Sequence, residues 1–447
     1  MSAQGEDQLM GNIGRPVDDA ASFKTTVIGE LPSDWHIAEL GNMATLIMGQ
    51  SPPSSTYNTQ RRGLPFLQGK AEFGSVFPVP AKWCDAPLRI APRGSILVSV
   101  RAPVGDANLA SEDCCIGRGL AALVAGQVVD TTFLFFNLRF ARQRMEDQGT
   151  GSTFKSINKG TLKAFRLPIP PLPEQRAIAR VLRTVQEAIE ATERVIETAK
   201  ELKRSMMEYL FTYGPVPVDQ ADQVELKETD AGTIPSVWRV ASLEALAREP
   251  VLNGLFVKRE RFGSGSHFVN VADTYKSSRV LWASLERVQA TNAEMDRYKL
   301  IGGDLLYVRS SLKREGIGNS ILVEAPPSGA TFDCHLIRVR LDTTQALPAY
   351  VNHYSRSARG KQGLIALSKT TTMTTINQKT LGSFRVPLSM RATQEQILRS
   401  VTATETKAAA GQRTLDSLKL LFKGLLHNLM TGKVRVTPTE QDMEGSE

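Results

Sequence analysis

The stretch at residues 156–168 reads SINKGTLKAFRLP, and residues 375–387 read TINQKTLGSFRVP. The offset between them is 219 residues (375 − 156), and it continues without a gap through the residues that follow. A second pair, PSDW at 32–35 and PSVW at 235–238, has an offset of 203 residues (235 − 32). Similar ends around middles of unlike length predict one scaffold that is used twice and carries two different surfaces.

The bulk composition favours a protein with a polyanionic partner. The chain has 447 residues and a formal net charge of +8 at pH 7, a sign that suits nucleic acid. Its four cysteines form no Cys-x-x-Cys pair and its five histidines complete no zinc pattern, so we expect reduced thiols and no metal. No apolar run is long enough to span a bilayer, and the first residues resemble no signal peptide. We therefore expect a cytoplasmic protein without a membrane partner.

The pattern of apolar residues predicts an α+β fold in two tandem copies. Residues 29–171 and 233–388 alternate apolar with polar residues between glycines and prolines, which is typical of short strands in a sheet. A long helical pattern follows each of them. The expected boundaries are, in order, an N-terminal arm at 1–28, the first α+β domain at 29–171, the first spacer helix at 172–213, an acidic linker at 214–232, the second domain at 233–388, the second spacer helix at 389–432 and a disordered tail at 433–447.

The two long helices share one apolar seam. Its positions step by three and four alternately and stay in register at the 219-residue offset. We expect it to contain Leu182, Val185, Ile189, Ile196, Met206 and Leu210 of the first helix, and Val401, Leu415, Leu418, Phe422, Leu425 and Leu429 of the second. Lys203 and Gly411 occupy weaker seam positions. Shared register favours an antiparallel coiled coil of the two helices; the alternative is that each helix packs on its own domain.

Catalytic motifs are missing from the sequence. Residues 149–156 resemble a phosphate-binding loop, but Phe154 stands where that loop needs glycine. Glu225 and Lys227 have the spacing of a nuclease motif, yet they lie in the predicted linker. No glycine-rich loop suited to a dinucleotide or adenosyl cofactor follows a strand. We therefore predict a non-catalytic binding subunit that uses no cofactor.

The end of the first copy resembles the specificity subunit of type I restriction-modification enzymes. Residues 156–168 lead into PLPEQ at 171–175 and then directly into a long helix, as in that family. The openings at 32–35 and 235–238 are similar to the starts of its domains. The second copy departs from the pattern, because residues 389–394 read SMRATQ and lack the proline run. This departure concerns the angle at which the second helix begins.

The resemblance implies two target-recognition domains that each read one half of an asymmetric, bipartite site in double-stranded DNA. It also implies that the helices form the spacer between the domains. Methylation and cleavage then belong to separate methyltransferase (M) and restriction (R) subunits, two of each. Two alternatives remain open: a non-catalytic coiled-coil scaffold and a stand-alone DNA-modifying enzyme.

Candidate DNA contacts lie in the predicted loops of the two unlike middles, because cations bind phosphates and a few side chains read base edges. In the first copy these are Arg61, Arg62, Gln68, Lys70, Arg101 and Lys155. In the second they are Lys258, Arg259, Arg261, Lys276, Arg309, Lys313, Arg314 and Lys369. For Asn158 and Asn377, a capping role and a base contact both stay open. Trp35 and Trp238 are expected to be core anchors.

Overall fold

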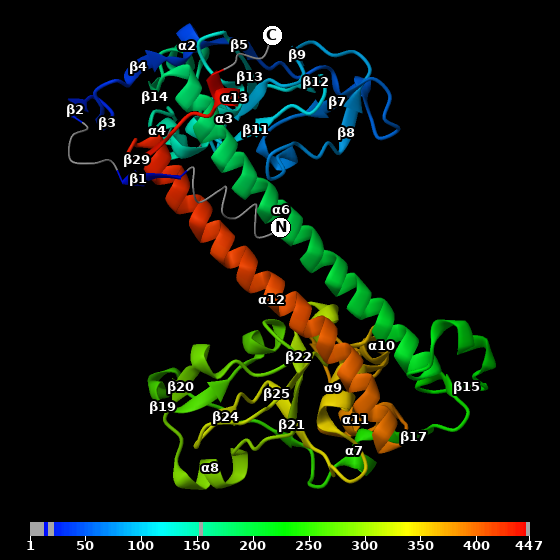
Figure 1. The fold of residues 1–447 in the computed structure, drawn as a ribbon. Coiled ribbons are helices and arrows are strands. Elements are labelled where there is room, and N and C mark those ends of the chain that lie inside the picture. Colours follow the sequence, from blue (N-terminus) through cyan, green and yellow to red (C-terminus); the bar gives the residue numbers. More distant parts are fainter. Residues whose placement is uncertain (1–12, 17–21, 152–154, 444–447) are drawn as a thin grey trace. The chain divides into compact units, whose positions relative to one another are not determined.

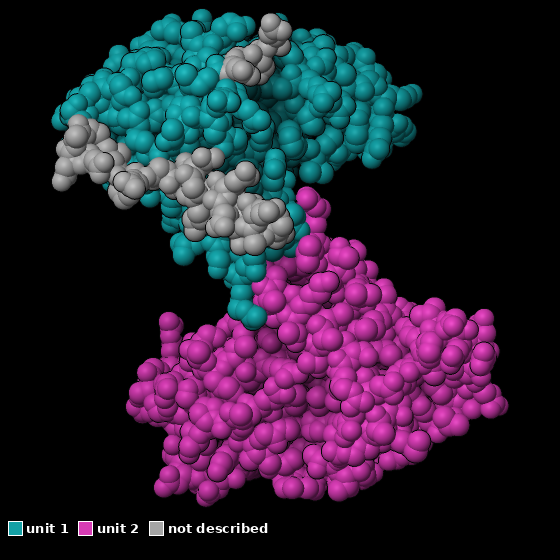
Figure 2. Space-filling model, viewed as in Figure 1, with its two compact units in different colours: residues 1–193, 413–447 teal, residues 194–412 magenta. Residues whose placement is uncertain are grey.

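The computed structural model describes residues 13–16, 22–151 and 155–443. The chain divides into two compact units, which Figure 2 shows in teal and magenta. Unit 1 comprises residues 1–193 and 413–447, and unit 2 comprises residues 194–412. Unit 1 is therefore assembled from two separate segments of the chain, whereas unit 2 is one continuous segment.

Two sheets form the frame of unit 1. The first is antiparallel, with strands in the order β11 (Ala107–Leu109), β10 (Ile96–Ser99), β13 (Leu120–Ala125) and β5 (Ala44–Met48). The second has the order β6 (Tyr57–Asn58), β8 (Lys82–Cys84), β7 (Leu64–Leu67), β12 (Cys114–Ile116) and β9 (Ile90–Ala91). Strands β7 and β12 run parallel, and the other neighbours in this sheet are antiparallel.

Unit 2 repeats this frame. Its antiparallel sheet has the order β23 (Ser320–Leu322), β21 (Asp304–Val308), β25 (Leu336–Arg340) and β18 (Leu252–Asn253). The second sheet has the order β20 (Glu286–Val288), β19 (Phe262–Val269) and β24 (Thr331–Phe332), with β19 and β24 parallel. Chain order and spatial order match those of unit 1 strand for strand in the first sheet. The predicted α+β class is thus confirmed, and one topology occurs twice.

Short helices occupy equivalent places in the two units, except α8 of unit 2, which has no counterpart among the described residues between β9 and β10 of unit 1. Unit 1 has α2 (Leu40–Met43), α3 (Thr131–Phe140), α4 (Arg142–Asp147) and α5 (Lys159–Lys163). Unit 2 has α7 (Leu243–Leu246), α8 (Asn292–Tyr298), α9 (Pro348–Arg356), α10 (Ala358–Ala366) and α11 (Gln378–Gly382). Asn158 and Asn377 cap α5 and α11, since each side-chain oxygen accepts the amide three residues later at 2.9 Å. The capping alternative therefore describes both asparagines.

Two long helices, α6 (Leu172–Tyr213) and α12 (Arg391–Met430), each begin in one unit and end in the other (Figure 1). Within unit 1, Lys419 of α12 lies 2.8 Å from Glu193 of α6. Within unit 2, Lys203 of α6 lies 2.6 Å from Glu405 of α12. Nine predicted seam residues are buried, namely Leu182, Val185, Ile189, Ile196, Leu210, Val401, Leu415, Phe422 and Leu429. Met206, Leu418 and Leu425 are half-buried.

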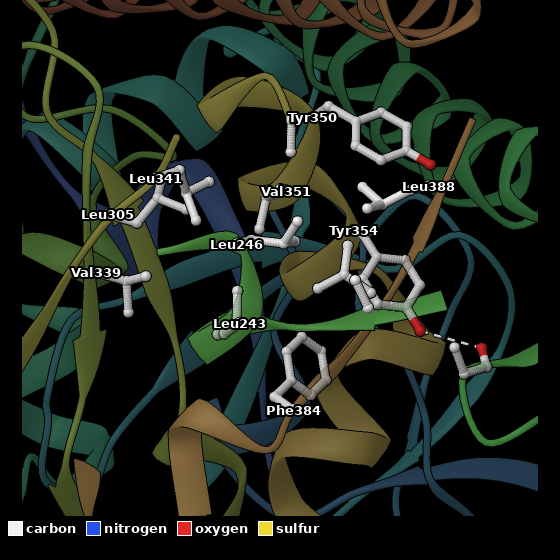
Figure 3. Close-up of a cluster of buried hydrophobic side chains, with 14 of the residues drawn as sticks. Leu243, Leu246, Leu305, Val339, Leu341, Tyr350, Val351, Tyr354, Phe384 and Leu388 are labelled. Carbon is white, nitrogen blue, oxygen red and sulfur yellow. Dashed lines mark hydrogen bonds between the residues drawn. The ribbon is translucent and has the colours of Figure 1, made fainter. Parts of the chain in front are cut away.

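The core of unit 2 packs α9 against the sheet. Leu305 of β21 and Val339 of β25 are fully buried, as are Tyr350 and Tyr354 of α9. Figure 3 shows the side chains of α9 gathered with those of α7 and with Phe384. The Tyr354 hydroxyl donates to the carbonyl of Ala231 at 3.0 Å, which satisfies the polar end of a buried ring.

A polar cluster connects α12 to α6, α9 and Ser278 within unit 2. Glu405 accepts from Lys203 at 2.6 Å and from Ser278 at 3.3 Å, and its other oxygen lies 3.9 Å from His353 of α9. Burial is the main cause that lowers the pKa of His353 to about 4; Glu405 opposes this, whereas Lys203, Arg279 and Arg356 add to it. His353 is therefore neutral near pH 7.

A buried glutamine near the start of each long helix bonds to the unit in which that helix begins. The Gln175 oxygen accepts from the Asp130 amide at 2.9 Å, and its nitrogen donates to the Pro170 carbonyl at 2.9 Å. Gln394 lies 219 residues later, and it accepts from the Leu347 amide at 2.9 Å and donates to the Ser389 carbonyl at 3.0 Å. Both side chains are 1% exposed. The second helix thus begins with the same joint as the first, although residues 389–394 lack the proline run.

Each unit opens with a hairpin that the expected boundaries cut. In unit 1, β2 (Phe23–Thr26) pairs with β3 (Gly29–Pro32), and in unit 2, β15 (Leu226–Thr229) pairs with β16 (Gly232–Pro235). Gly29 and Gly232 hold the turns with positive φ of 115° and 93°. The acidic linker expected at 214–232 is therefore partly strand. Of the N-terminal arm expected at 1–28, residues 1–12 and 17–21 lie outside the described residues.

The C-terminal segment differs from the expected disordered tail. β29 (Val434–Val436) pairs with β1 (Ile13–Pro16), and a short helix, α13 (Glu440–Met443), follows. Arg435 bonds Asp34 at 2.7 Å and Glu174 at 2.5 Å. Asp442 bonds Arg180 at 2.7 Å. These ion pairs order residues 433–443, and residues 444–447 lie outside the described residues.

The starting tryptophans are core residues, as expected. Trp35 is fully buried and its indole nitrogen donates to Glu174 at 3.2 Å, while Trp238 is 6% exposed. Pro168 and Pro387 lie in β14 (Arg166–Ile169) and β28 (Arg385–Leu388), which pair with β4 (His36–Glu39) and β17 (Arg239–Ser242) beside these openings. In each unit, the strand that follows the tryptophan therefore pairs with the strand that leads into a long helix.

Candidate nucleic-acid interface

A three-residue turn links the parallel strand pair to the main sheet in each unit. It comprises residues 117–119 between β12 and β13, and residues 333–335 between β24 and β25. The first residue of each turn donates its amide to the end of the parallel strand, at 2.8 Å in unit 1 and 2.9 Å in unit 2. The last residue accepts an amide from the residue at the end of the central strand, Val100 in unit 1 and Arg309 in unit 2, at 2.9 and 2.8 Å. The two turns are thus structural equivalents.

A glycine packs against each turn. A Cβ on Gly49 would lie 2.1 Å from the Gly117 carbonyl, and a Cβ on Gly254 would lie 2.2 Å from the Asp333 carbonyl. Side chains are therefore excluded from both positions, and the backbone after β5 or β18 lies directly on the turn. This close packing fixes the turn and any side chain it presents.

Backbone contacts place four polar residues around the turn of unit 1, and we call Gln68, Arg101, Arg118 and Lys155 the basic edge of unit 1. Ser51 Oγ accepts from Gln68 at 3.0 Å and from the Arg118 amide at 3.2 Å. Arg101 pairs with Ser156, and the Lys155 carbonyl accepts the amide of the residue after Arg101 at 3.0 Å. The three cations of this edge are exposed.

The equivalent edge of unit 2 also gathers predicted residues, and we call Arg309, Lys313, Arg314 and Lys369 the basic edge of unit 2. A small antiparallel sheet in the order β22 (Ser310–Ser311), β27 (Thr374–Thr375) and β26 (Lys369–Thr370) connects them. Arg309 precedes β22, and its Nη1 donates to the Cys334 carbonyl at 3.4 Å. Lys313, Arg314 and Lys369 are exposed.

Four predicted cations lie away from these edges. Arg61 and Arg62 precede β7, whereas Gln68 follows it, so they lie at opposite ends of that strand. Arg61 has a positive φ of 59° and lies 5.3 Å from the centre of the Trp83 ring. Lys258 and Arg259 likewise precede β19, at the far end from the turn of unit 2. The structure therefore separates the candidates of each unit into two places.

Three further predicted cations already have carboxylate partners. Lys70 lies 2.8 Å from Asp106 and lines a cavity of about 320 Å³ with Arg139 and Arg142. Arg261 lies 2.5 Å from Glu294, an ion pair that is the main cause lowering the pKa of this carboxyl to about 2.

Lys276 lies 2.8 Å from Asp273. A paired cation has to give up its partner before it binds a phosphate, so the residues of the two basic edges are the stronger candidates.

Sequence reasoning missed Arg118. It is exposed in the middle of the turn of unit 1, between two glycines whose Cβ positions would lie 2.9 Å and 2.4 Å from atoms of Gln68. The signal was present as Gly-Arg-Gly between two apolar strands, but no repeat in the sequence marks this position. Among the described residues, no helix is long and apolar enough to cross a membrane.

Part of the chain matches a known protein family. Residues 32–201 match the family model of the type I restriction modification DNA specificity domain. The putative MjaX specificity subunit of Methanocaldococcus jannaschii is 45% identical over 194 residues, which are 43% of this chain and 46% of that subunit. The chain thus aligns with less than half of that relative.

Two longer matches extend the likeness. The EcoKI specificity subunit of Escherichia coli K12 is 24% identical over 433 residues, 92% of this chain and 91% of that subunit. The crystal structure of the type I restriction-modification S subunit from M. genitalium has the same fold, with a TM-score of 0.61, 15% identity, and coverage of 92% of this chain and 97% of that chain. The likeness to this S subunit shows that the two chains share a fold. Residues 32–201 thus resemble the DNA specificity domain of type I restriction-modification enzymes.

Proposed function

We propose that this chain is the DNA-reading subunit of a type I restriction-modification enzyme and that its two units read the two unlike halves of a bipartite site. The observation that carries this proposal is the repeated basic edge. One frame presents cations at the same turn in both units, yet the side chains differ between Gln68, Arg118 and their counterparts Asn270 and Cys334. Two domains with the same strand order but different side chains at the turn are suited to reading two half-sites of different sequence.

The helices α6 and α12 act in this proposal as an antiparallel coiled-coil spacer. Support comes from the ion pairs Glu193–Lys419 and Lys203–Glu405 and from the burial of the seam. A Cβ on Gly411 would lie 2.9 Å from Ile196 Cγ1, so the α12 backbone lies against the α6 side chain there. The chain then directs two methyltransferase and two restriction subunits to the site it has read.

The spacer is tested by removing one heptad from each helix, residues 194–200 and residues 408–414. Both deletions lie between the two ion pairs, which stay in place. Seven helical residues span about 10 Å, and DNA rises about 3.4 Å per base pair, so the preferred gap between half-sites should shorten by about 3 base pairs. The site is mapped first by sequencing methylated DNA from cells that carry the chain with a methyltransferase subunit. A variant that keeps the original gap contradicts the spacer role.

DNA contact is tested by the salt dependence of binding. Lys313→Ala and Lys369→Ala should each weaken binding on all sequences and reduce the slope of log K against log salt by about 1. Arg399→Ala, an exposed cation on α12, is the matched control and should change neither quantity. A coiled-coil scaffold would bind no DNA at any salt concentration. Methyl transfer to DNA by the purified chain alone would indicate a stand-alone enzyme.

A further inference from the structure

The turn of unit 2 places three metal-ligand side chains side by side. The Asp333 Oδ1 and His335 Nδ1 atoms are 2.8 Å apart, and the Cys334 Sγ and His335 Nδ1 atoms are 3.5 Å apart. All three donor atoms lie within 4.8 Å of one another, and the described residues contain one such group. The turn itself is held by Gly254, so the three side chains start from a fixed backbone.

The donor set matches a soft divalent cation. Zinc binds thiolate at about 2.3 Å and imidazole or carboxylate at about 2.0–2.2 Å, so its tetrahedral ligands lie roughly 3.3–3.6 Å from one another. The sulfur–nitrogen distance already fits, and the oxygen–nitrogen pair has to open by about 0.5 Å. A thiolate with an imidazole favours zinc over magnesium or calcium. Three protein ligands leave a fourth position open toward solvent.

The charge balance at the turn gives such a cation a role. A divalent cation bound by residues 333–335 would bring positive charge to the turn, beside the Asp333 carboxylate. In the turn of unit 1 the residue at the place of Cys334 is Arg118, which carries one positive charge.

We propose that residues 333–335 bind a divalent cation of the zinc class, and that this cation supplies to the basic edge of unit 2 the charge that Arg118 supplies in unit 1. The second half of this statement rests on the proposed DNA-reading function. The sequence alone predicted no metal, because Cys334 lacks a Cys-x-x-Cys partner. Instead of a second cysteine, the neighbouring Asp333 and His335 would supply the other metal ligands.

Cobalt binding to the full-length chain tests the site. Cys84, Cys114 and Cys115 are buried and Cys334 is half-buried, so Cys334 is the accessible thiol among them. After dialysis against chelator, one equivalent of Co²⁺ should give a thiolate-to-metal absorption band. Cys334→Ser should abolish the band and Asp333→Asn should weaken binding at least about tenfold. The control His36→Gln changes an exposed histidine of unit 1 and should bind as the wild type does.

Circular dichroism and thermal unfolding without metal confirm that each variant is folded. The absence of a thiolate band in the wild type overturns the site, as does a band of equal intensity in folded Cys334→Ser.

DNA binding with and without Zn²⁺ tests the charge role. Zinc should tighten binding of the wild type and leave Cys334→Ser unchanged, whereas magnesium should have no such effect. Arg118→Ala should weaken DNA binding, which is the opposite of the change that zinc causes through unit 2. If cobalt binds but zinc leaves the DNA affinity unchanged, the charge role is overturned. If the chain binds no DNA under any condition, the proposed function fails, and the cobalt spectrum still decides the metal site.

Discussion

Gln394→Leu should destabilise the contact between the start of α12 and the start of α9 in unit 2. The side chain is 1% exposed and forms two hydrogen bonds, with the Leu347 amide at 2.9 Å and the Ser389 carbonyl at 3.0 Å. Leucine has a similar volume but leaves both backbone groups without a hydrogen-bond partner, and each unsatisfied group lowers the stability by about 1–3 kcal/mol. Met390 at this joint is 80% exposed, so water can reach part of the opened site. We therefore expect a loss of about 2–4 kcal/mol.

Hydrogen exchange followed by mass spectrometry measures this loss locally. A change of about 2–4 kcal/mol corresponds to exchange that is roughly 30- to 700-fold faster in peptides that cover the start of α9 and of α12. Gln396→Leu is the control, because this glutamine is exposed and its bond to the Pro215 carbonyl is long, 3.4 Å. Unchanged protection in Gln394→Leu would refute the reasoning that this glutamine holds the helix to the unit.

Three further predictions concern other joints. Gly254→Ala should destabilise unit 2 by about 1–3 kcal/mol in urea unfolding, because its Cβ overlaps the Asp333 carbonyl, whereas Gly424→Ala on an open helix face should gain about 0.5–1 kcal/mol. The free energy of unfolding of unit 2 should fall by about 3 kcal/mol as the pH drops from 6.5 to 4, because His353 binds a proton at a higher pH in the unfolded state than in the folded state. His353→Gln should remove this fall. A variant with the same pH dependence as the wild type would contradict the prediction. Arg435→Met should strip two carboxylates of their partner and make residues 433–443 sensitive to limited proteolysis; equal resistance in variant and wild type would count against the clasp.

The sequence predicted the ends of each domain and the long helices better than the strands and loops between those ends. The repeat is gap-free at the joints, but its offset drifts along the chain. It is 203 at the openings, 205 between Gly49 and Gly254 (254 − 49), 209 between Val100 and Arg309 (309 − 100), and 219 at the helices. Short insertions accumulate between equivalent strands, so no single offset aligns the two turns. Hydrogen bonds identify them because they follow the backbone and not the sequence.

Charge in the sequence predicted which residues are cationic but not which are available. Lys70 and Arg261 are neutralised by Asp106 and Glu294, which are 36 and 33 residues away in the chain (106 − 70 and 294 − 261). Folding brings these partners together, and a local pattern does not contain them. Lys276 is the exception, because Asp273 lies three residues before it and the pairing could have been inferred.

The units also show that the frame requires hydrogen bonds rather than particular residues. The carbonyl of Pro168 accepts from Asn137 at 2.8 Å, and the equivalent carbonyl of Pro387 accepts from Tyr350 at 2.9 Å. Both carbonyls belong to the strand that leads into a long helix. A buried carbonyl without a donor is costly, and each copy satisfies it with a different donor residue. Comparison of residues alone would miss this equivalence.

Among the described residues, an ion-pair joint of unit 1 has no counterpart in unit 2, and this difference follows from the path of the chain. Unit 1 is made of two segments, and its second segment returns only after the whole of unit 2, so closing unit 1 costs more chain entropy than closing a continuous unit. Arg435 offsets this cost by clasping Asp34 and Glu174, and it holds the pKa of Asp34 below its usual value. In unit 2 the position of Asp34 is taken by Val237, which is 89% exposed, and that of Glu174 by Thr393. The ion pairs of Arg435 are present at the joint where two separated segments must meet, and the continuous unit has Val237 and Thr393 in place of the two carboxylates.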